Sequence, residues 1–368
     1  MRIALVILHA DPARGGAERY TVDLAAALLR RGHEVSLLAS SFASPIPSVT
    51  CVTIESPGLT RAGRYRSFLA ALDAHLTSMS YDVVHAMLPV NRCDVYHPHA
   101  GMAAAAARKW NVALNPRRGA MARTERTLLT GDHPPITIAL SQYVKRSILE
   151  HYPLPDERLA TLFNAVDLSK FDPTTPAVIR ERAEESDRGG WEQALLIAND
   201  FDRKGVKYAI AALAQMKDGP LELAVVGRPK PSAYKRQAHS LGVGNHVYFI
   251  PAVADPAYLY NSSAFFVLPT KHDPCSLVVL EALAMGLPVI STVFNGATEI
   301  MTDGVHGYVL NDPTDVDALA DAMRKLLDPD RRRAMRDACL ELRPKLSYEH
   351  HLDELMNIYH RAVAAHRK

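Results

Sequence analysis

The chain has 368 residues and a formal charge of +2, with 42 Lys and Arg against 40 Asp and Glu. That length predicts two domains, and the near-neutral balance excludes a general attraction for nucleic acid. The four cysteines are scattered, the first apolar run is too short for a signal peptide, and no run approaches the roughly 20 apolar residues of a membrane span, so a cytoplasmic protein is expected.

The first segments read as a strand at 2–8, a helix at 17–31 and a second strand at 33–39. Gly15 and Gly16 precede the helix and would let backbone amides approach a ligand, although a plain tight turn would use the same residues. The G-x-G-x-x-G pattern of dinucleotide-binding proteins is absent, so no nicotinamide or flavin cofactor is expected.

Further βα units follow, with strands at 50–55, 82–85 and 136–140 and helices at 62–79 and 141–151. A loop after the strand at 82–85 carries His97 and His99, which would place imidazoles at the carboxyl edge of a sheet. Metal binding is improbable there, because no Cys or carboxylate stands at ligand spacing. A structural role, with rings hydrogen-bonded to backbone, remains the alternative.

The segment 101–131 is expected to be helical between 102 and 130, and it is strongly basic. Its charged residues are Arg108, Lys109, Arg117, Arg118, Arg123 and Arg126 against Glu125 alone. Apolar residues between them, including Trp110, Leu128 and Leu129, could enter a lipid headgroup region while the cations stay at its surface. The sequence therefore predicts Arg117, Arg118, Arg123 and Trp110 as membrane or acceptor contacts, with a solvated basic face as the alternative.

The second half repeats the alternation, with strands at 194–198, 221–226, 246–250 and 265–268. Arg203 and Lys204 follow the first of these strands at a helix start, where cations oppose the helix dipole. That placement indicates an anion between them, and two cations there could bind both phosphates of a diphosphate. Asp200-Phe201-Asp202 has the letters of a metal-chelating D-x-D motif, but the adjacent cations already supply positive charge.

The stretch 273–292, D-P-C-S-L-V-V-L-E-A-L-A-M-G-L-P-V-I-S-T, organises the chain. Ser276 is a good N-cap, Gly286 closes the helix, and Pro288 prevents its continuation. The unpaired amides of residues 276 to 279 and the positive end of the dipole predict a phosphate site. Asp273 and Glu281 can face the same crevice, although an ordinary amphipathic helix with a buried Glu is the alternative.

This stretch resembles the E-x(7)-E signature of retaining, nucleotide-sugar-dependent glycosyltransferases of family 4. Asp273 stands for the first Glu, and Cys275 and Ser276 replace Phe and Gly. Residues 163–171, F-N-A-V-D-L-S-K-F, resemble the interdomain connection of the same family, with Ala165 in place of Gly. The resemblance implies an α/β GT-B fold, with two Rossmann-like, doubly wound domains that face each other across a cleft. It places the acceptor domain at 1–168, joined by a terminal helix at 347–368, and the donor domain at 169–346.

The resemblance also implies roles for single residues. His99, or failing it His97, would contact the donor sugar at the reaction centre. Lys204 would bind the diphosphate with Arg203, so that Lys204→Ala is expected to reduce transfer with little effect on folding. Asp273 would bind a sugar hydroxyl and Glu281 the ribose. The remaining donor contacts would be Gly15 and Gly16, the backbone of Ser276, Leu277 and Val278, and, for the base, Ile250 and Pro251.

The expected activity is retaining, metal-independent transfer of a hexose from UDP-glucose or a similar nucleotide sugar, without a cofactor. The segments D-F-D-R-K-G-V and D-V-Y look most like lipopolysaccharide core glucosyltransferases, which implies a glycan or lipid-linked acceptor and peripheral contact with the anionic inner face of the cytoplasmic membrane. Two alternatives stay open: a UDP-sugar 2-epimerase of the same fold, and an inactive nucleotide-binding relative that acts as a scaffold.

Overall fold

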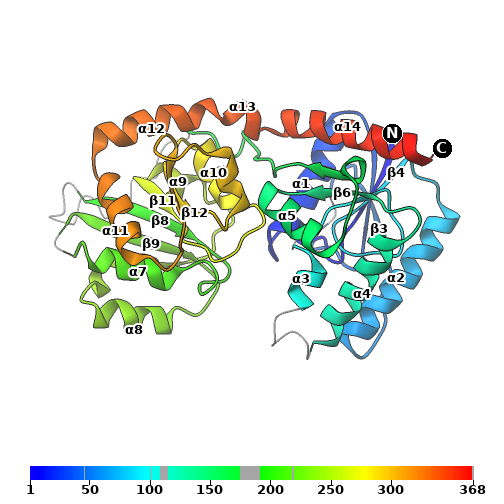
Figure 1. The fold of residues 1–368 in the computed structure, drawn as a ribbon, viewed down its shortest axis with the longest axis horizontal. Helices are drawn as coiled ribbons and strands as arrows, with labels where there is room; N and C mark the ends of the chain where they lie inside the picture. The colour runs from blue at the N-terminus through cyan, green and yellow to red at the C-terminus, as the bar shows by residue number, and fades with distance from the viewer. Residues whose placement is uncertain (45, 100, 108–114, 175–190, 218, 367–368) are drawn as a thin grey trace. The chain divides into compact units, whose positions relative to one another are not determined.

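The computed structural model describes residues 1–368 except 45, 100, 108–114, 175–190, 218 and 367–368. The chain divides into two compact units, residues 1–164 with 348–368 and residues 165–347 (Figure 1). Each unit is a parallel sheet flanked by helices, which confirms the predicted pair of Rossmann-like domains.

The N-terminal unit has a seven-stranded sheet in the order β3-β2-β1-β4-β5-β6-β7, counted over its described residues. Its strands are β1 (Arg2–Val6), β2 (Glu34–Ala39), β3 (Thr50–Thr53), β4 (Val83–Ala86), β5 (Val95–Tyr96), β6 (Ile136–Ala139) and β7 (Leu159–Thr161). Its helices are α1 (Gly16–Arg30), α2 (Arg61–Ser78), α3 (Ala103–Ala107), α4 (Pro116–Thr130), α5 (Gln142–His151) and α14 (Tyr348–His366). The first strand is fully buried from Ile3 to Val6, as a parallel strand covered on both faces must be.

The strand order reverses beside β1, which pairs with β2 on one side and β4 on the other. Such a switch point leaves a crevice at the carboxyl ends of the strands, where doubly wound sheets bind ligands. The loop after β1 and the loop after β4 border that crevice.

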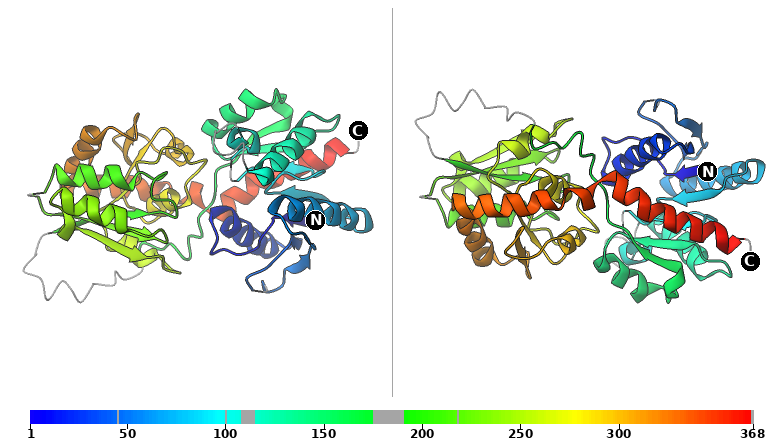
Figure 2. Two further views of the ribbon diagram at one scale, coloured as in Figure 1. Left: turned by 90° about the horizontal axis from the view of Figure 1, so that it is seen from below. Right: turned by 90° about the horizontal axis from the view of Figure 1, so that it is seen from above.

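The last helix, α14, belongs to the N-terminal unit and runs beside α1 (Figure 2). The Nη1 atom of Arg31 lies 2.7 Å from an oxygen of Asp353, and Nδ1 of His85 lies 2.8 Å from the hydroxyl of Tyr359. These contacts join the chain's last helix to α1 and to the sheet strand β4.

The prediction that residues 102–130 are helical is wrong at Asn115, whose backbone is extended just before α4 begins at Pro116. Asn115 caps α4, since its side chain accepts a hydrogen bond from the amide of Arg118 at 3.4 Å, and Pro116 suits the first helical position. Residues 108–114, which include Trp110, lie outside the described residues.

The C-terminal unit has a six-stranded parallel sheet in the order β10-β9-β8-β11-β12-β13, counted over its described residues. Its strands are β8 (Glu192–Ile197), β9 (Leu221–Gly227), β10 (Val247–Pro251), β11 (Phe265–Val267), β12 (Val289–Thr292) and β13 (Gly307–Leu310). Its helices are α7 (Val206–Ala214), α8 (Ser232–Ser240), α9 (Ala257–Asn261), α10 (Leu277–Ala284), α11 (Val316–Lys325), α12 (Pro329–Glu341) and α13 (Arg343–Leu346). Helices α7 and α8 lie on one face of this sheet, and α9 and α10 lie on the other (Figure 1).

Two glycines bring the carboxyl ends of neighbouring strands of this sheet unusually close. Gly205, with φ of 77°, lies where a Cβ would come 2.1 Å from the carbonyl oxygen of Pro269. A Cβ on Gly227 would lie 1.9 Å from the carbonyl oxygen of Ala198. Only glycine fits at either position, and the loops after β8, β9 and β11 therefore pack backbone against backbone.

Candidate active site

A buried cation and a buried carboxylate meet at the start of α10. The ammonium of Lys204 pairs with the Asp273 carboxylate, and its Nζ lies 3.5 Å from Oγ of Ser276. All three side chains are buried. Burial lowers the pKa of Lys204, and the charge of Asp273 opposes that shift. The structure thus brings together three residues that the sequence predicted for one donor site.

The backbone holds Lys204 in place from both sides. Its amide donates to the carbonyl of Asp200 at 3.0 Å, and Gly205 next to it is the N-cap of α7 and has a left-handed conformation. The carbonyl of the preceding residue, Arg203, accepts from the amide of Lys271 at 2.9 Å. The loop with Lys204 is therefore tied to the loop that leads to Asp273.

Asp273 is fixed by the segment that follows β12. Its amide donates to the Phe294 carbonyl at 2.8 Å, and its own carbonyl accepts from Gly296 at 3.0 Å. The Asn295 side-chain oxygen accepts from the amides of Ser276 at 3.2 Å and Ala297 at 3.1 Å. Sequence reasoning missed Asn295, although an Asn-Gly pair shortly after a strand is a turn signal that could have drawn attention to it.

The predicted anion site at the start of α10 is smaller than expected. Of the four amides from 276 to 279, that of Ser276 is taken by Asn295, and that of Val279 donates to the Ser276 carbonyl at 3.2 Å. The amides of Leu277 and Val278 make no hydrogen bond to the described part of the chain. Two free amides therefore remain next to the Lys204 ammonium, at the positive end of the α10 dipole.

Glu281 lies further along α10 and is buried. Its Oε2 accepts a hydrogen bond of 2.8 Å from the hydroxyl of Tyr260, which comes from α9. The phenol therefore orients the carboxylate that the sequence assigned to the ribose. Tyr260 is a second residue that sequence reasoning missed.

Arg203 lies beside Lys204 but is held by its neighbours. Its Nη1 donates to the His272 carbonyl at 2.7 Å, and its Nε lies 3.3 Å from Oδ2 of Asp200. Asp202 pairs with Lys271 at 3.0 Å. The carboxylates of Asp200 and Asp202 are thus each paired with a cationic side chain, which does not favour a metal ion between them.

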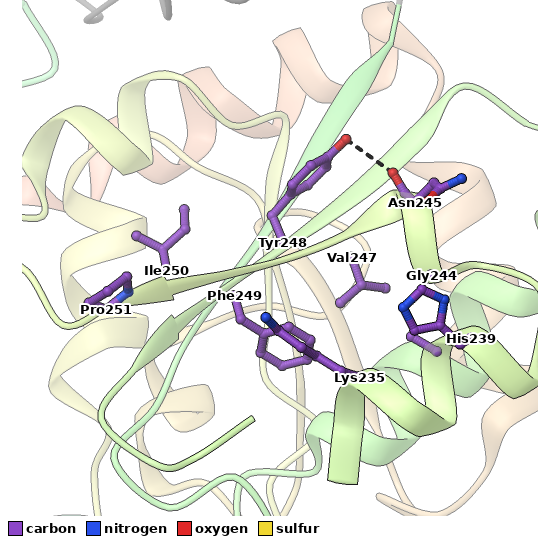
Figure 3. Close-up of a pocket in the computed structure, with 10 residues that line it drawn as sticks. Lys235, His239, Gly244, Asn245, Val247, Tyr248, Phe249, Ile250 and Pro251 are labelled. Carbon is purple, nitrogen blue, oxygen red and sulfur yellow. Dashed lines mark hydrogen bonds between the residues drawn. The ribbon is translucent and has the colours of Figure 1, made fainter. Parts of the chain in front are cut away.

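Ile250 and Pro251 lie on β10, the edge strand, and line an open groove of about 730 Å³. Figure 3 shows Val247 and Phe249 on the same side of the strand as Lys235 and His239 of α8, with the Tyr248 hydroxyl bonded to the Asn245 carbonyl at 3.0 Å. Pro251 is the last residue of β10, and Lys204 follows the carboxyl end of β8 in the same sheet. Their strands are two apart, which corresponds to roughly 10 Å.

The N-terminal unit gathers four histidines around Tyr20. His85 stacks on His97 at 5.4 Å between ring centroids, His99 lies 4.3 Å from His97, and Tyr20 lies 4.1 Å from His99. Nδ1 of His351 donates to the Phe163 carbonyl at 2.8 Å, so its Nε2 accepts from the Tyr20 hydroxyl, also at 2.8 Å.

Both predicted histidines are buried, and each has a ring nitrogen without a hydrogen-bond partner within the described residues. Neither ring nitrogen of His97, nor Nε2 of His99, has a hydrogen-bond partner within the described residues. Burial lowers the pKa of each well below its ordinary value, so both rings are neutral near pH 7. The alternative of a ring bonded to backbone is therefore wrong for His97. Buried unpaired nitrogens at the carboxyl edge of a sheet are suited to a polar ligand.

The other predicted positions in this unit differ in burial. Gly15 is extended, with φ of 177°, and caps α1 at Gly16, so neither glycine forms a left-handed tight turn. Arg118 and Arg123 are exposed on α4, whereas Arg117 is half-buried.

The expectation that the apolar residues of the basic segment enter a headgroup layer is wrong for two of them. Leu128 and Leu129 are 6% and 3% exposed and pack inside the unit. Glu125 is also buried, where it accepts hydrogen bonds from the Tyr96 hydroxyl and the amides of α3. Among the described residues of this segment, the exposed cations are Arg118, Arg123 and Arg126 of α4.

Within the described residues, no three His, Cys, Asp or Glu are grouped so that they could hold a metal ion. A search of the same residues also finds no helix with the length and apolar character needed to cross a membrane.

Family models match both halves of the chain. The model described as Glycosyltransferase Family 4 matches residues 14–170, and that described as Glycosyl transferases group 1 matches residues 179–339. The two matches meet near the division between the units.

Among curated proteins, the lipopolysaccharide glucosyltransferase WaaG of Escherichia coli K12 is 26% identical, over 85% of this chain and 86% of the relative. A D-inositol 3-phosphate glycosyltransferase of Kribbella flavida is 28% identical, over 92% of this chain and 91% of the relative.

Among solved structures, a WaaG crystal structure superposes with a TM-score of 0.80 at 24% identity, covering 93% of this chain and 95% of that one. HepE of Anabaena, solved with UDP and glucose, superposes with a TM-score of 0.75 at 17% identity, covering 97% and 98%. At these identities the likeness is one of fold.

Proposed function

Because the chain belongs to the family 4 glycosyltransferases with the GT-B fold, we propose that it moves a hexose from a UDP-sugar such as UDP-glucose to a glycan or glycolipid acceptor. The transfer retains the configuration at the anomeric carbon and needs no metal ion. The observation that carries this proposal is the buried Lys204 ammonium beside the free amides of Leu277 and Val278.

That arrangement suits the leaving group of the reaction. As the bond from the anomeric carbon to the diphosphate oxygen breaks, negative charge develops on the diphosphate, and preorganised donors stabilise it. In the structure, the Lys204 ammonium is paired with the Asp273 carboxylate. A bound diphosphate would therefore compete with Asp273 for this cation. The carboxylate would then be free to accept a hydrogen bond from a sugar hydroxyl.

No carboxylate in the site is placed as an obvious nucleophile, which favours transfer on a single face of the sugar. The acceptor oxygen attacks from the side that the diphosphate leaves, and its proton passes to an oxygen of that diphosphate. His99 and His97, neutral and with unpaired ring nitrogens, would bind hydroxyls of the donor sugar. Glu281, oriented by Tyr260, would bind the ribose, and Ile250 and Pro251 would border the base.

The test is incubation with UDP-[14C]glucose, with and without a lipopolysaccharide inner-core acceptor. A transferase releases UDP rapidly only with the acceptor and labels it, with slow hydrolysis otherwise. Conversion of the donor to a 2-epimer without acceptor would replace this proposal by the epimerase reaction. Binding of UDP with no transfer to any acceptor would indicate a scaffold.

The relatives divide over the acceptor, since one is named for lipopolysaccharide and others for inositol 3-phosphate. We favour the lipopolysaccharide core, because the basic face of α4 suits an acceptor at a membrane. An inositol phosphate acceptor is the second candidate, and a direct comparison of the two acceptors in the same assay decides between them.

We also propose that the protein lies at the inner face of the cytoplasmic membrane. The exposed cations of α4 are Arg118, Arg123 and Arg126, and each is worth roughly 1 kcal/mol near an anionic leaflet. Sedimentation with phosphatidylglycerol vesicles should fade as salt rises and should be lost when Arg117, Arg118 and Arg123 become Gln. Binding that ignores lipid charge would contradict peripheral attachment by these arginines.

A further inference from the structure

Six buried aromatic rings form a continuous row in the N-terminal unit, and both ends of the row lie on α14. In order, the row contains His351, Tyr20, His99, His97, His85 and Tyr359. The two end residues are roughly two helical turns apart, or about 12 Å along α14. The helix and the row therefore form a closed loop, which passes through α1, the loop after β5, and β4.

Hydrogen bonds hold the two ends of the row. The hydroxyl of Tyr20 donates to Nε2 of His351 at 2.8 Å, and Nδ1 of that imidazole donates to the Phe163 carbonyl at 2.8 Å. At the other end, the Tyr359 hydroxyl lies 2.8 Å from Nδ1 of His85. Each tyrosine ring is buried and tied by its hydroxyl, so its position is fixed.

The two central rings are held differently. Neither ring nitrogen of His97, nor Nε2 of His99, has a hydrogen-bond partner in the part of the chain that the structure describes. Tyr20 lies 4.1 Å from His99 between ring centroids, with a tilt of 37°. His85 lies 5.4 Å from His97, within 12° of parallel. A hydrogen bond on one ring nitrogen commonly fixes where the other nitrogen points, and for these rings packing against their neighbours takes that place.

Ordinary core packing does not account for this arrangement. An imidazole nitrogen that is buried without a partner lowers the stability of the fold, so native cores rarely contain one. Three neighbouring imidazoles have such nitrogens, namely His85, His97 and His99. Their nitrogens are suited to a polar ligand, whereas the three outer residues of the row use their polar atoms within the protein.

We propose that the outer residues of this row are positioning residues for sugar transfer. Tyr20, which His351 holds by its hydroxyl, orients the ring of His99. At the other end, Tyr359 fixes the ring that stacks on His97. The inference rests on the proposed function, in which these two histidines bind hydroxyls of the donor sugar, and it assigns part of that task to the last helix of the chain.

The share of donor binding that the sugar contributes is the ratio of the Kd for UDP-glucose to the Kd for UDP, measured by calorimetry on the full chain. Tyr20→Phe removes one hydroxyl and keeps the ring. It should raise this ratio about tenfold, which corresponds to the loss of about one hydrogen bond to the sugar. Tyr359→Phe should raise the ratio as well. The Kd for UDP alone should not change, because Lys204 and Glu281, the proposed diphosphate and ribose contacts, lie in the C-terminal unit.

Tyr65→Phe is the matched control. Tyr65 is buried in the same unit, and its hydroxyl donates to the Pro89 carbonyl at 2.6 Å. It packs in a hydrophobic cluster of the described residues that contains Phe68 and Leu69 and none of the six rings. Loss of its buried hydrogen bond should lower the melting temperature about as much as Tyr20→Phe does, but it should leave the ratio unchanged.

Double-variant cycles separate positioning from general stability. If Tyr20 acts through His99, adding Tyr20→Phe to His99→Ala should not raise the ratio further, because the group that it orients is already gone. The same is expected when Tyr359→Phe is added to His97→Ala. Effects that add in both cycles would overturn the proposal, as would an equal rise of the ratio in Tyr65→Phe. Non-additivity in one cycle only would assign the sugar contact to that histidine and overturn the role of the other end of the row.

These outcomes are distinct from failure of the proposed function. If neither His99→Ala nor His97→Ala changes the ratio, the histidines do not bind the donor sugar, and the inference falls with that part of the proposed function. If the histidine variants raise the ratio and the tyrosine variants leave it unchanged, the inference alone is overturned. If the ratio changes as expected in a protein that transfers no glucose to any acceptor, the positioning residues stand for donor binding and the proposed reaction does not.

Discussion

Replacement of Lys204 by Ala would leave the Asp273 carboxylate buried without its cation. The side chains of the pair are 9% and 11% exposed, so water cannot replace the ammonium. Removal of one partner of such a buried pair costs about 3–5 kcal/mol. At about 2–4 °C per kcal/mol for a domain of this size, the melting temperature of the C-terminal unit should fall by about 6 to 20 °C. From the sequence, Lys204→Ala was expected to have little effect on folding. The burial of the pair leads us to expect a clear loss of stability instead.

The double variant Lys204→Ala with Asp273→Asn separates stability from chemistry. The substituted amide is neutral, so most of the lost stability should return, while transfer stays at least about 100-fold below wild type because no cation meets the leaving diphosphate. Differential scanning calorimetry and UDP release measure the two effects on the same samples.

Lys271→Ala is the matched control, because Lys271 forms an exposed ion pair with Asp202. Its loss should change stability by less than about 1 kcal/mol. A melting temperature of Lys204→Ala equal to that of Lys271→Ala would refute the buried pair. Recovery of transfer in the double variant would refute the role of the cation.

Three further outcomes are expected. Glu281→Gln should raise the KM for the UDP-sugar more than it lowers kcat. Tyr260→Phe should do the same to a smaller extent, because it removes one hydrogen bond that orients the carboxylate, and kcat effects alone in both variants would contradict ribose binding. Acid should destabilise the N-terminal unit: burial lowers the pKa of His85 to about 3 and that of His351 to about 4 from the ordinary 6.5, so the unfolded chain gains protons below about pH 6.5 while the folded unit does not. Stability should therefore fall by up to about 1.4 kcal/mol per pH unit for each imidazole between about pH 6.5 and 4, and a melting temperature independent of pH in that window would count against the buried neutral cluster. Transfer should survive EDTA, and a loss of activity that Mg²⁺ restores would show that a metal is required.

The parts of the fold that the sequence predicted best are those with strong local signals. Around α10, the small N-cap Ser276, the left-handed Gly286 and the following Pro288 mark both helix ends, and the structure agrees. The short edge strands β7 and β13 were missed. They have three and four residues and several half-exposed positions, so neither an apolar run nor a clear alternation identifies them.

The sequence predicted which residues form the candidate site better than it predicted the hydrogen bonds that hold them in place. Lys204, Asp273 and Ser276 meet as expected, because each follows a strand of one parallel sheet or begins a helix there. The residues that orient these side chains could not be predicted from the sequence pattern. Asn295 and Tyr260 act through contacts that form only in the packed fold. Their partners Ser276 and Glu281 are too distant in the sequence for residue spacing to indicate the contact.

Gly205 and Gly227, which allow the strand ends to pack closely, limit how this enzyme could come to use a different donor sugar. Since Gly205 lies against Pro269 and Gly227 against Ala198, the loop with Lys204 has no room to shift and make space for a larger sugar. Evolution or design must then change the side chains of the short segment from Asp273 to Ser276, while the backbone that carries them stays as it is. The departures from the family signature at Asp273, Cys275 and Ser276 fall in this segment, so donor preference is expected to change through substitutions there and to resist insertions in the neighbouring loops.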